Sequence, residues 1–252
     1  MEITVLGSGD AFCGGGRGNA AYLVEDARGR LLIDCGPTAP HALRRAGVAL
    51  PSIEHILVTH LHGDHVAGIP FILLAGVYEP PHPERLTVTG PRFLERQVEA
   101  AFAAFYPDAA RTPRPFALAY REIAPGATAD VGGRRVTAFP MHHMSGEHVA
   151  LGYRIESDGR ILAVTGDTGR AAPLADLAAG ADLLICECTL PAPAPGAAPS
   201  AAKHLSIADI RALRPALAAR RVLLTHLSAE ARAEAGAIPD VEVAEDGARI
   251  AL

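Results

Sequence analysis

Three histidines and one aspartate crowd into six residues of this chain, His60-Leu-His62-Gly-Asp64-His65, directly after the apolar run 56–58. Burying these groups together would carry a large desolvation cost unless a cation bound them. Neutral imidazole and carboxylate are ordinary ligands of divalent metals. His60 and His62 project to one side of an extended loop, whereas Asp64 and His65 begin the next helix and face a neighbouring position. The motif therefore predicts two adjacent metal ions.

Six residues cannot close two metal sites, so other ligands must come from elsewhere in the chain. Three further apolar runs are each followed by a residue that can bind metal, namely His143, Asp167 and His226. Loops at strand ends are where a rigid scaffold displays functional groups. These three residues are therefore candidate ligands, and His142 is the alternative to His143.

Short apolar runs recur along the chain and predict β-strands. The pairs Asp158-Gly159 and Gly132-Gly133 separate neighbouring runs, as two-residue hairpin turns do. The predicted strands are 3–6, 21–24, 31–34, 56–58, 86–89, 135–139, 151–155, 161–164, 183–186 and 222–224, with a final pair near 241–243 and 248–251.

Helical patterns lie between these runs. Ser206-Ile-Ala-Asp209 has the form of a helix start before an apolar periodic segment. Helices alternating with strands, some of which also pair as hairpins, predict a layered α/β architecture. The predicted helices are 38–46, 66–77, 92–105, 171–179, 206–220 and 229–235.

Composition narrows the class of protein. With 49% hydrophobic and 20% charged residues, the 252-residue chain can bury a core. Its net charge of −5 argues against a broad basic surface for nucleic acid. No apolar run reaches the roughly 18 residues that a membrane span needs. The four cysteines fit neither a CxxC zinc site nor a dense disulfide framework, so we expect free thiols and a cytoplasmic protein.

The motifs resemble those of the metallo-β-lactamase superfamily. The resemblance spans nearly the whole chain and implies a single domain, residues 1–252, with a four-layer αββα sandwich of two mixed β-sheets flanked by helices. It also implies that Asp34 supports the metal-binding loop. The segments that carry the resemblance are 7–12, 32–36, 59–68, 152–155, 165–169 and 225–228.

The resemblance further implies how the ligands divide between two divalent ions. Zinc is the metal we expect first, and manganese or iron suits the same ligands. The implied ligands are His60, His62 and His143 for the first ion, Asp64, His65 and His226 for the second, and Asp167 as a bridge between them.

Within the superfamily, the chain looks most like the phosphodiesterase branch, which includes RNase Z and phosphoribosyl cyclic phosphodiesterase. Glu187 follows an apolar strand and His204 precedes the next helix, as in that branch. The implied enzyme is a binuclear metal-dependent hydrolase in which a metal-bridging hydroxide attacks a phosphodiester. Asp64 would orient this hydroxide or accept its proton, His204 would protonate the leaving group, and Glu187 would orient His204.

The resemblance also bears on the substrate. Members that process tRNA carry a long arm between the third-motif histidine and the bridging aspartate. Here only 23 residues separate His143 from Asp167. A small or cyclic phosphodiester is therefore expected, with nucleic acid disfavoured, no membrane partner and a homodimer allowed. The alternatives are hydrolysis of esters, lactones or thioesters, an RNase Z-like ribonuclease without the arm, a di-iron oxidoreductase and a metal-binding module without turnover.

Two segments have open roles. Residues 91–121 combine aromatic and arginine residues, and they either face a substrate or a dimer partner or pack a helix on the core. Residues 191–202 consist almost wholly of proline, alanine, glycine and serine, and they predict a mobile loop that is either a lid or without a role.

Overall fold

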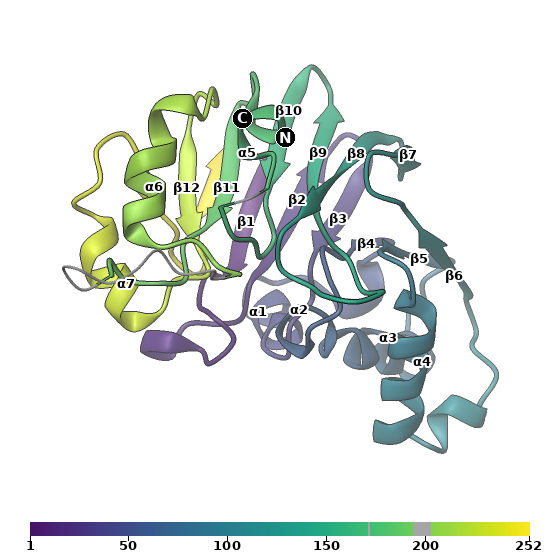
Figure 1. Ribbon diagram of the computed structural model, residues 1–252. Coiled ribbons are helices and arrows are strands. Elements are labelled where there is room, and N and C mark those ends of the chain that lie inside the picture. Colours follow the sequence, from purple (N-terminus) through teal and green to yellow (C-terminus); the bar gives the residue numbers. More distant parts are fainter. Residues whose placement is uncertain (171, 194–202) are drawn as a thin grey trace.

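The computed structural model describes residues 1–170, 172–193 and 203–252, and within them two seven-stranded sheets pack face to face (Figure 1). The first sheet has the order β14 (Arg249–Ala251), β1 (Glu2–Gly7), β2 (Ala21–Asp26), β3 (Gly29–Ile33), β4 (His55–Leu57), β5 (Arg85–Gly90) and β6 (Ala117–Glu122). The second has the order β13 (Glu242–Val243), β12 (Val222–Thr225), β11 (Leu183–Glu187), β10 (Arg160–Val164), β9 (Ala150–Ser157), β8 (Arg134–Met141) and β7 (Thr128–Val131).

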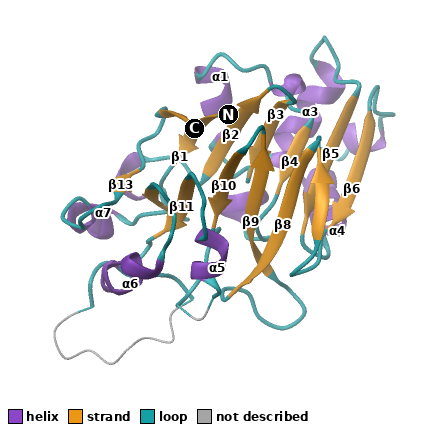
Figure 2. Cartoon of the chain, turned by 90° about the horizontal axis from the view of Figure 1, so that it is seen from above, coloured by secondary structure: helices purple, strands orange, loops and turns teal. Residues whose placement is uncertain are grey.

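Helices cover the outer face of each sheet, which confirms the predicted αββα sandwich (Figures 1 and 2). The helices on the first sheet are α1 (Ala39–Arg45), α2 (Gly63–Val66), α3 (Ile69–Tyr78) and α4 (Leu94–Phe105). Those on the second are α5 (Leu174–Ala178), α6 (Ile207–Leu213) and α7 (Ala229–Ala235). Among the described residues, no helix is both long and apolar enough to cross a membrane.

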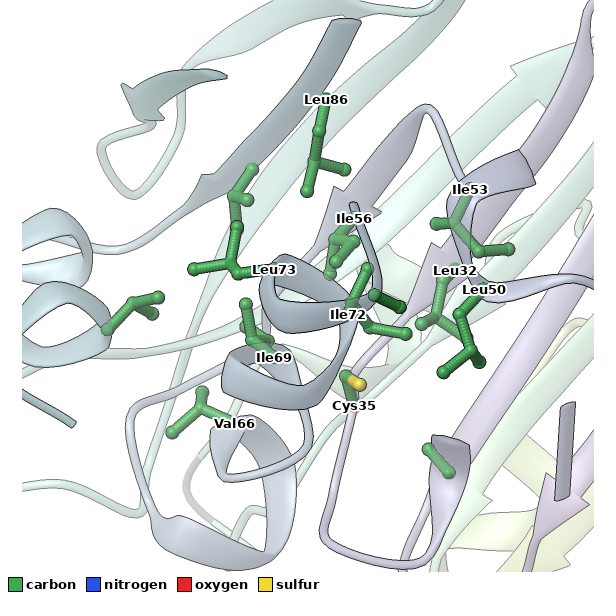
Figure 3. Close-up of a cluster of buried hydrophobic side chains, with 14 of the residues drawn as sticks. Leu32, Cys35, Leu50, Ile53, Ile56, Val66, Ile69, Ile72, Leu73 and Leu86 are labelled. Atoms are coloured by element: carbon green, nitrogen blue, oxygen red, sulfur yellow. The ribbon is translucent and has the colours of Figure 1, made fainter. Parts of the chain in front are cut away.

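Alternation along the strands separates the hydrophobic core into layers, because successive side chains point to opposite faces of a sheet. Leu31 and Ile33 of β3 lie in the layer between the two sheets. Leu32, between them in sequence, points the other way and belongs to the buried cluster that also contains Leu50 and the α3 residue Ile72 (Figure 3). A third apolar layer lies between the second sheet and its helices.

The direction of the strands brings several loops to one edge of the sandwich. Strands β10, β11 and β12 are parallel, and β9 runs antiparallel between β8 and β10, so β8 runs in the direction of β10. The loops after β8, β10 and β12 therefore leave the second sheet at the same edge. The loop after β4 comes from the first sheet and supplies the residues of the His60–His65 motif.

Some predicted elements differ from the structure. The helix predicted over 66–77 is divided into α2 and α3 at Gly68, and the helix over 206–220 ends as α6 at Leu213, before Pro215. Strand β7 was not predicted because it is short and has no apolar run, and strand β6 was not predicted because its apolar run, 116–120, lies in the segment 91–121 that was interpreted as a helix and loop. The two strands predicted near 241–243 and 248–251 are both present, but they lie in different sheets, since β13 joins β12 and β14 joins β1.

The two segments with open roles are described only in part. In the first, Phe102 and Phe116 are buried in the core, whereas Phe105 is 53% exposed, so the aromatic residues of 91–121 mainly pack the helix on the sheet. In the second, residues 194–202 lie outside the described residues, as does residue 171 at the start of the helix predicted over 171–179.

Candidate metal centre

The seven side chains proposed as ligands meet at one edge of the sandwich. They form two groups that share Asp167, and within each group the potential ligand atoms lie within 4.8 Å of one another. The first group is His60, His62, His143 and Asp167, and the second is Asp64, His65, Asp167 and His226. This division is the one implied by the family resemblance.

The first group is built around His62. Its Nδ1 lies 3.1 Å from Nε2 of His60 and 3.0 Å from Nε2 of His143. Asp167 Oδ2 lies 3.7 Å from each of those two Nε2 atoms. His143 therefore faces the group, whereas His142 is exposed and points elsewhere.

In the second group, two imidazoles and two carboxylates alternate. Nε2 of His65 lies 3.3 Å from Asp64 Oδ2 and 3.4 Å from Asp167 Oδ1. Nε2 of His226 lies 3.4 Å from each of the same two oxygens. The positive φ of His226, 54°, turns its ring back toward the centre from the end of β12.

Hydrogen bonds on the far side of each ring determine which nitrogen faces the centre. Nδ1 of His65 donates to Asp34, and Nδ1 of His143 donates to the carbonyl of Lys203, 2.9 Å away. The Thr59 hydroxyl donates to Asp34 and so accepts from Nδ1 of His60.

The Thr189 hydroxyl has the corresponding position beside His226. It donates to Glu187 Oε2 at 2.8 Å and accepts from Nδ1 of His226, also at 2.8 Å. With Nδ1 protonated in His60, His65, His143 and His226, the lone pairs of four Nε2 atoms converge on the centre. Thr59 and Thr189 were not predicted to support ligands, because their contacts depend on the folded chain.

The residues present fit divalent cations. Converging lone pairs repel one another, and a cation removes this repulsion by accepting them. Nε2 of His65 and Oδ1 of Asp167 are buried and have no hydrogen-bond partner among the described residues, although buried polar atoms are almost always paired. Both atoms face the second group, where a metal ion would satisfy them.

The pKa shifts of the candidate ligands agree with a site for divalent cations. Burial lowers the pKa of His60 well below its usual range, so the ring is neutral, as a ligand must be. Burial opposes the charge of Asp64, but hydrogen bonds with His226 and His65 outweigh it and hold its pKa far below normal. Burial also opposes protonation of His65, yet Asp167 and Asp34 raise its pKa well above normal. The surroundings of His65 therefore favour positive charge.

Glu187 and His204 form a pair beside the second group. Nδ1 of His204 donates to Glu187 Oε1 at 2.9 Å, and Glu187 is 1% exposed at the end of β11. The backbone N–H groups of Thr168 and Thr189 also donate to this carboxylate, at 2.7 and 3.1 Å. Burial lowers the pKa of His204, but Glu187 outweighs it, so the pKa is raised. The His204 ring stacks on that of His226, with centroids 5.7 Å apart.

Comparison with known proteins agrees with this arrangement. Residues 29–227 match the family model described as a beta-lactamase superfamily domain. Ribonuclease Z from Mycobacterium bovis is 31% identical over 196 residues, which cover 73% of this chain and 69% of that protein.

Solved structures share the fold over its whole extent. The short form of human tRNase Z has a TM-score of 0.76 and 24% identity, covering 100% of this chain and 99% of that chain. A diphosphatase from the PhnP family has a TM-score of 0.75 and 18% identity, covering 100% and 97%. The chain therefore belongs to the β-lactamase superfamily, has the metallo-β-lactamase fold and falls in the branch that includes ribonuclease Z.

Proposed function

We propose that this protein is a binuclear metal-dependent hydrolase that cleaves a small or cyclic phosphodiester. The observation that carries the proposal is that Asp167 is common to two complete groups of ligand atoms. Similarity to ribonuclease Z supports phosphodiester chemistry. The His204–Glu187 pair supports it further, because it places a proton donor beside the ligands.

We assign His60, His62 and His143 to one ion, Asp64, His65 and His226 to the other, and Asp167 to both. Zinc is the expected metal, and manganese or iron would suit the same ligands. When bound, a pair of such ions makes water nucleophilic near neutral pH and offsets negative charge on phosphoryl oxygens.

The side chains of the protein would handle the protons. Asp64, ionised and 13% exposed, can orient the attacking water or accept its proton. Nδ1 of His204 is hydrogen-bonded to Glu187, so Nε2 of the same ring can donate a proton to the oxygen of the leaving group. Glu187 holds the ring in this orientation and stabilises its charged form, as its effect on the His204 pKa indicates.

The loops beside the centre favour a small substrate. Residues 144–166 form a short loop followed by the hairpin of β9 and β10, with a two-residue turn at Asp158-Gly159. This stretch contains no long arm. The net charge of −5 also provides no general attraction for a polyanion.

Ribonuclease activity on RNA is a second candidate, favoured by the 31% identity to ribonuclease Z. Hydrolysis of an ester, lactone or thioester is a third, because the same centre could polarise a carbonyl group. A panel of bis(p-nitrophenyl) phosphate, a 2′,3′-cyclic nucleotide, a precursor tRNA, a lactone and a thioester separates them. We expect the two small phosphodiesters to be hydrolysed with the highest kcat/KM. Faster turnover of precursor tRNA or of a carbonyl substrate would contradict the proposal.

A further inference from the structure

A second cavity lies apart from the metal centre. It has a volume of about 610 Å³ and is enclosed by β1, by α1 and by the turns 13–18 and 246–249. None of its lining residues belongs to either ligand group. Pockets that hold small ligands have volumes of roughly 300–1,000 Å³, so this cavity has room for one.

The charged groups around this cavity are mostly cationic. Arg17, Arg45 and Arg249 line it, with Asp246 as the acidic residue among the lining side chains. Asp246 is already engaged, since Oδ1 accepts from the N–H and the hydroxyl of Ser8, and Oδ2 accepts from the N–H of Gly18. Because Glu2 Oε1 lies 3.7 Å from Nη1 of Arg249, the excess of positive charge in the cavity comes from Arg17 and Arg45.

Arg17 is the least ordinary of these residues, because it is 8% exposed and yet has no carboxylate within 4.0 Å in the described part of the chain. Nη2 donates to the carbonyl of Leu227 at 2.6 Å, while Nε is buried away from the cavity and has no hydrogen-bond partner among the described residues. A buried charge is costly unless it is paired. An anion in the cavity would offset the positive charge of this guanidinium.

The remaining walls combine apolar and polar side chains. Leu6 of β1, Ala42 of α1 and Ala46, the residue after α1, line the cavity together with Thr4, Thr38 and His41. The apolar part of these walls suits a hydrocarbon or aromatic group. A ligand that matches both parts has an anionic group at the arginines and an apolar body along β1 and α1.

We propose that this cavity binds a small organic anion, with a phosphate or carboxylate group beside Arg17 and Arg45. The site is independent of the metal ligands, so it goes beyond the proposed hydrolysis. Phenyl phosphate and benzoate are suitable probes, because they present the same ring with either anionic group. Inorganic phosphate tests the anionic group alone.

The experiment is calorimetric titration of metal-free protein at constant ionic strength, which keeps the outcome independent of the hydrolase proposal. Arg45→Ala and Arg17→Met each remove one cation from the cavity. Arg44→Ala is the matched control, because Arg44 is the neighbouring residue on α1 but pairs with Glu79 and does not line this cavity. Arg45 is exposed, so Arg45→Ala tests the site even if Arg17→Met does not fold.

We expect saturable binding of phenyl phosphate or benzoate with one site per chain, and weaker binding of inorganic phosphate. Arg45→Ala and Arg17→Met should each raise Kd about tenfold, as loss of a charge-assisted contact does, while Arg44→Ala leaves Kd unchanged. Three results would overturn the proposal: no saturable binding of either ring compound up to about 10 mM, equal weakening by all three variants, or binding that survives both cavity variants.

Discussion

Nδ1 of His65 lies 2.8 Å from Oδ2 of Asp34, a carboxylate that is 1% exposed. The same oxygen accepts a hydrogen bond from the Thr59 hydroxyl, and that hydroxyl in turn accepts a hydrogen bond from Nδ1 of His60. One carboxylate thus orients a ligand of each group, and the φ of Asp34, 55°, turns it away from the line of β3 to do so. The assembly of both groups therefore depends on Asp34.

Asp34→Asn should weaken metal binding about 10- to 100-fold, as loss of a hydrogen-bonding partner behind a metal ligand typically does. Asparagine tolerates the left-handed backbone conformation and has nearly the same shape as aspartate, so the substitution mainly removes the negative charge. Competition with a chromophoric chelator gives the affinity. An unchanged affinity would show that Asp34 only ends the strand.

His204→Ala should retain its metal and lose about 10²- to 10⁴-fold in kcat on a 2′,3′-cyclic nucleotide, because the alkoxide leaving group needs a proton. The loss on bis(p-nitrophenyl) phosphate should be much smaller, since p-nitrophenolate leaves without one. Steady-state kinetics on both substrates, with metal content as the control, test the role. Equal losses on the two substrates would contradict proton donation.

A buried ion pair joins the two sheets far from the metal centre. Arg134 is fully buried at the start of β8, and its Nη2 and Nε donate to the carboxylate of Asp26 on β2, at 2.7 and 2.9 Å. Arg134→Met should lower the free energy of unfolding by about 3–5 kcal/mol, because it leaves a buried charge without its partner. Urea unfolding measures this, and the exposed neighbour Arg135→Met should change stability by less than about 0.5 kcal/mol. Similar losses in the two variants would contradict the assignment.

The same pair predicts a pH effect on stability. Burial would raise the pKa of Asp26, but hydrogen bonds from Arg134, Arg28 and Ser157 outweigh it and lower the pKa. Its contribution is therefore complete above the unfolded pKa of about 3.9 and is lost as pH falls through the lower folded value. The stability difference between the wild type and Asp26→Asn should shrink as pH falls from about 5 to 3. A difference that stays constant or grows would contradict the lowered pKa.

The sequence predicted the parts of the fold that local patterns determine. Strands buried on both faces, such as β10 and β11, appear as continuous apolar runs, and the hairpin turns at Asp158-Gly159 and Gly132-Gly133 have the expected positive φ. The capping box predicted at Ser206 is also present. Strand β6, an edge strand that is largely exposed, was missed because its apolar run, 116–120, was interpreted as part of a helix and loop.

Contacts between distant segments were less predictable. The ligand set was implied by motif order, and the folded chain brings its members into two groups. The threonines that orient the rings, the carbonyl of Lys203 and the pair of Asp26 with Arg134 have no local pattern, because each contact joins elements that only the fold brings together. The cavity beside Arg17 was not predicted for the same reason, because its lining residues come from segments that are far apart in the sequence.

Metal stoichiometry of the wild type and of Asp167→Ala tests the central claim most directly. We predict two divalent ions per chain in the wild type after zinc loading, and loss of binding at both positions in Asp167→Ala together with loss of phosphodiester hydrolysis. The variant should still fold, as circular dichroism would show. A wild type that binds no zinc, or an Asp167→Ala protein that retains two tightly bound ions, would contradict a centre built around this shared carboxylate.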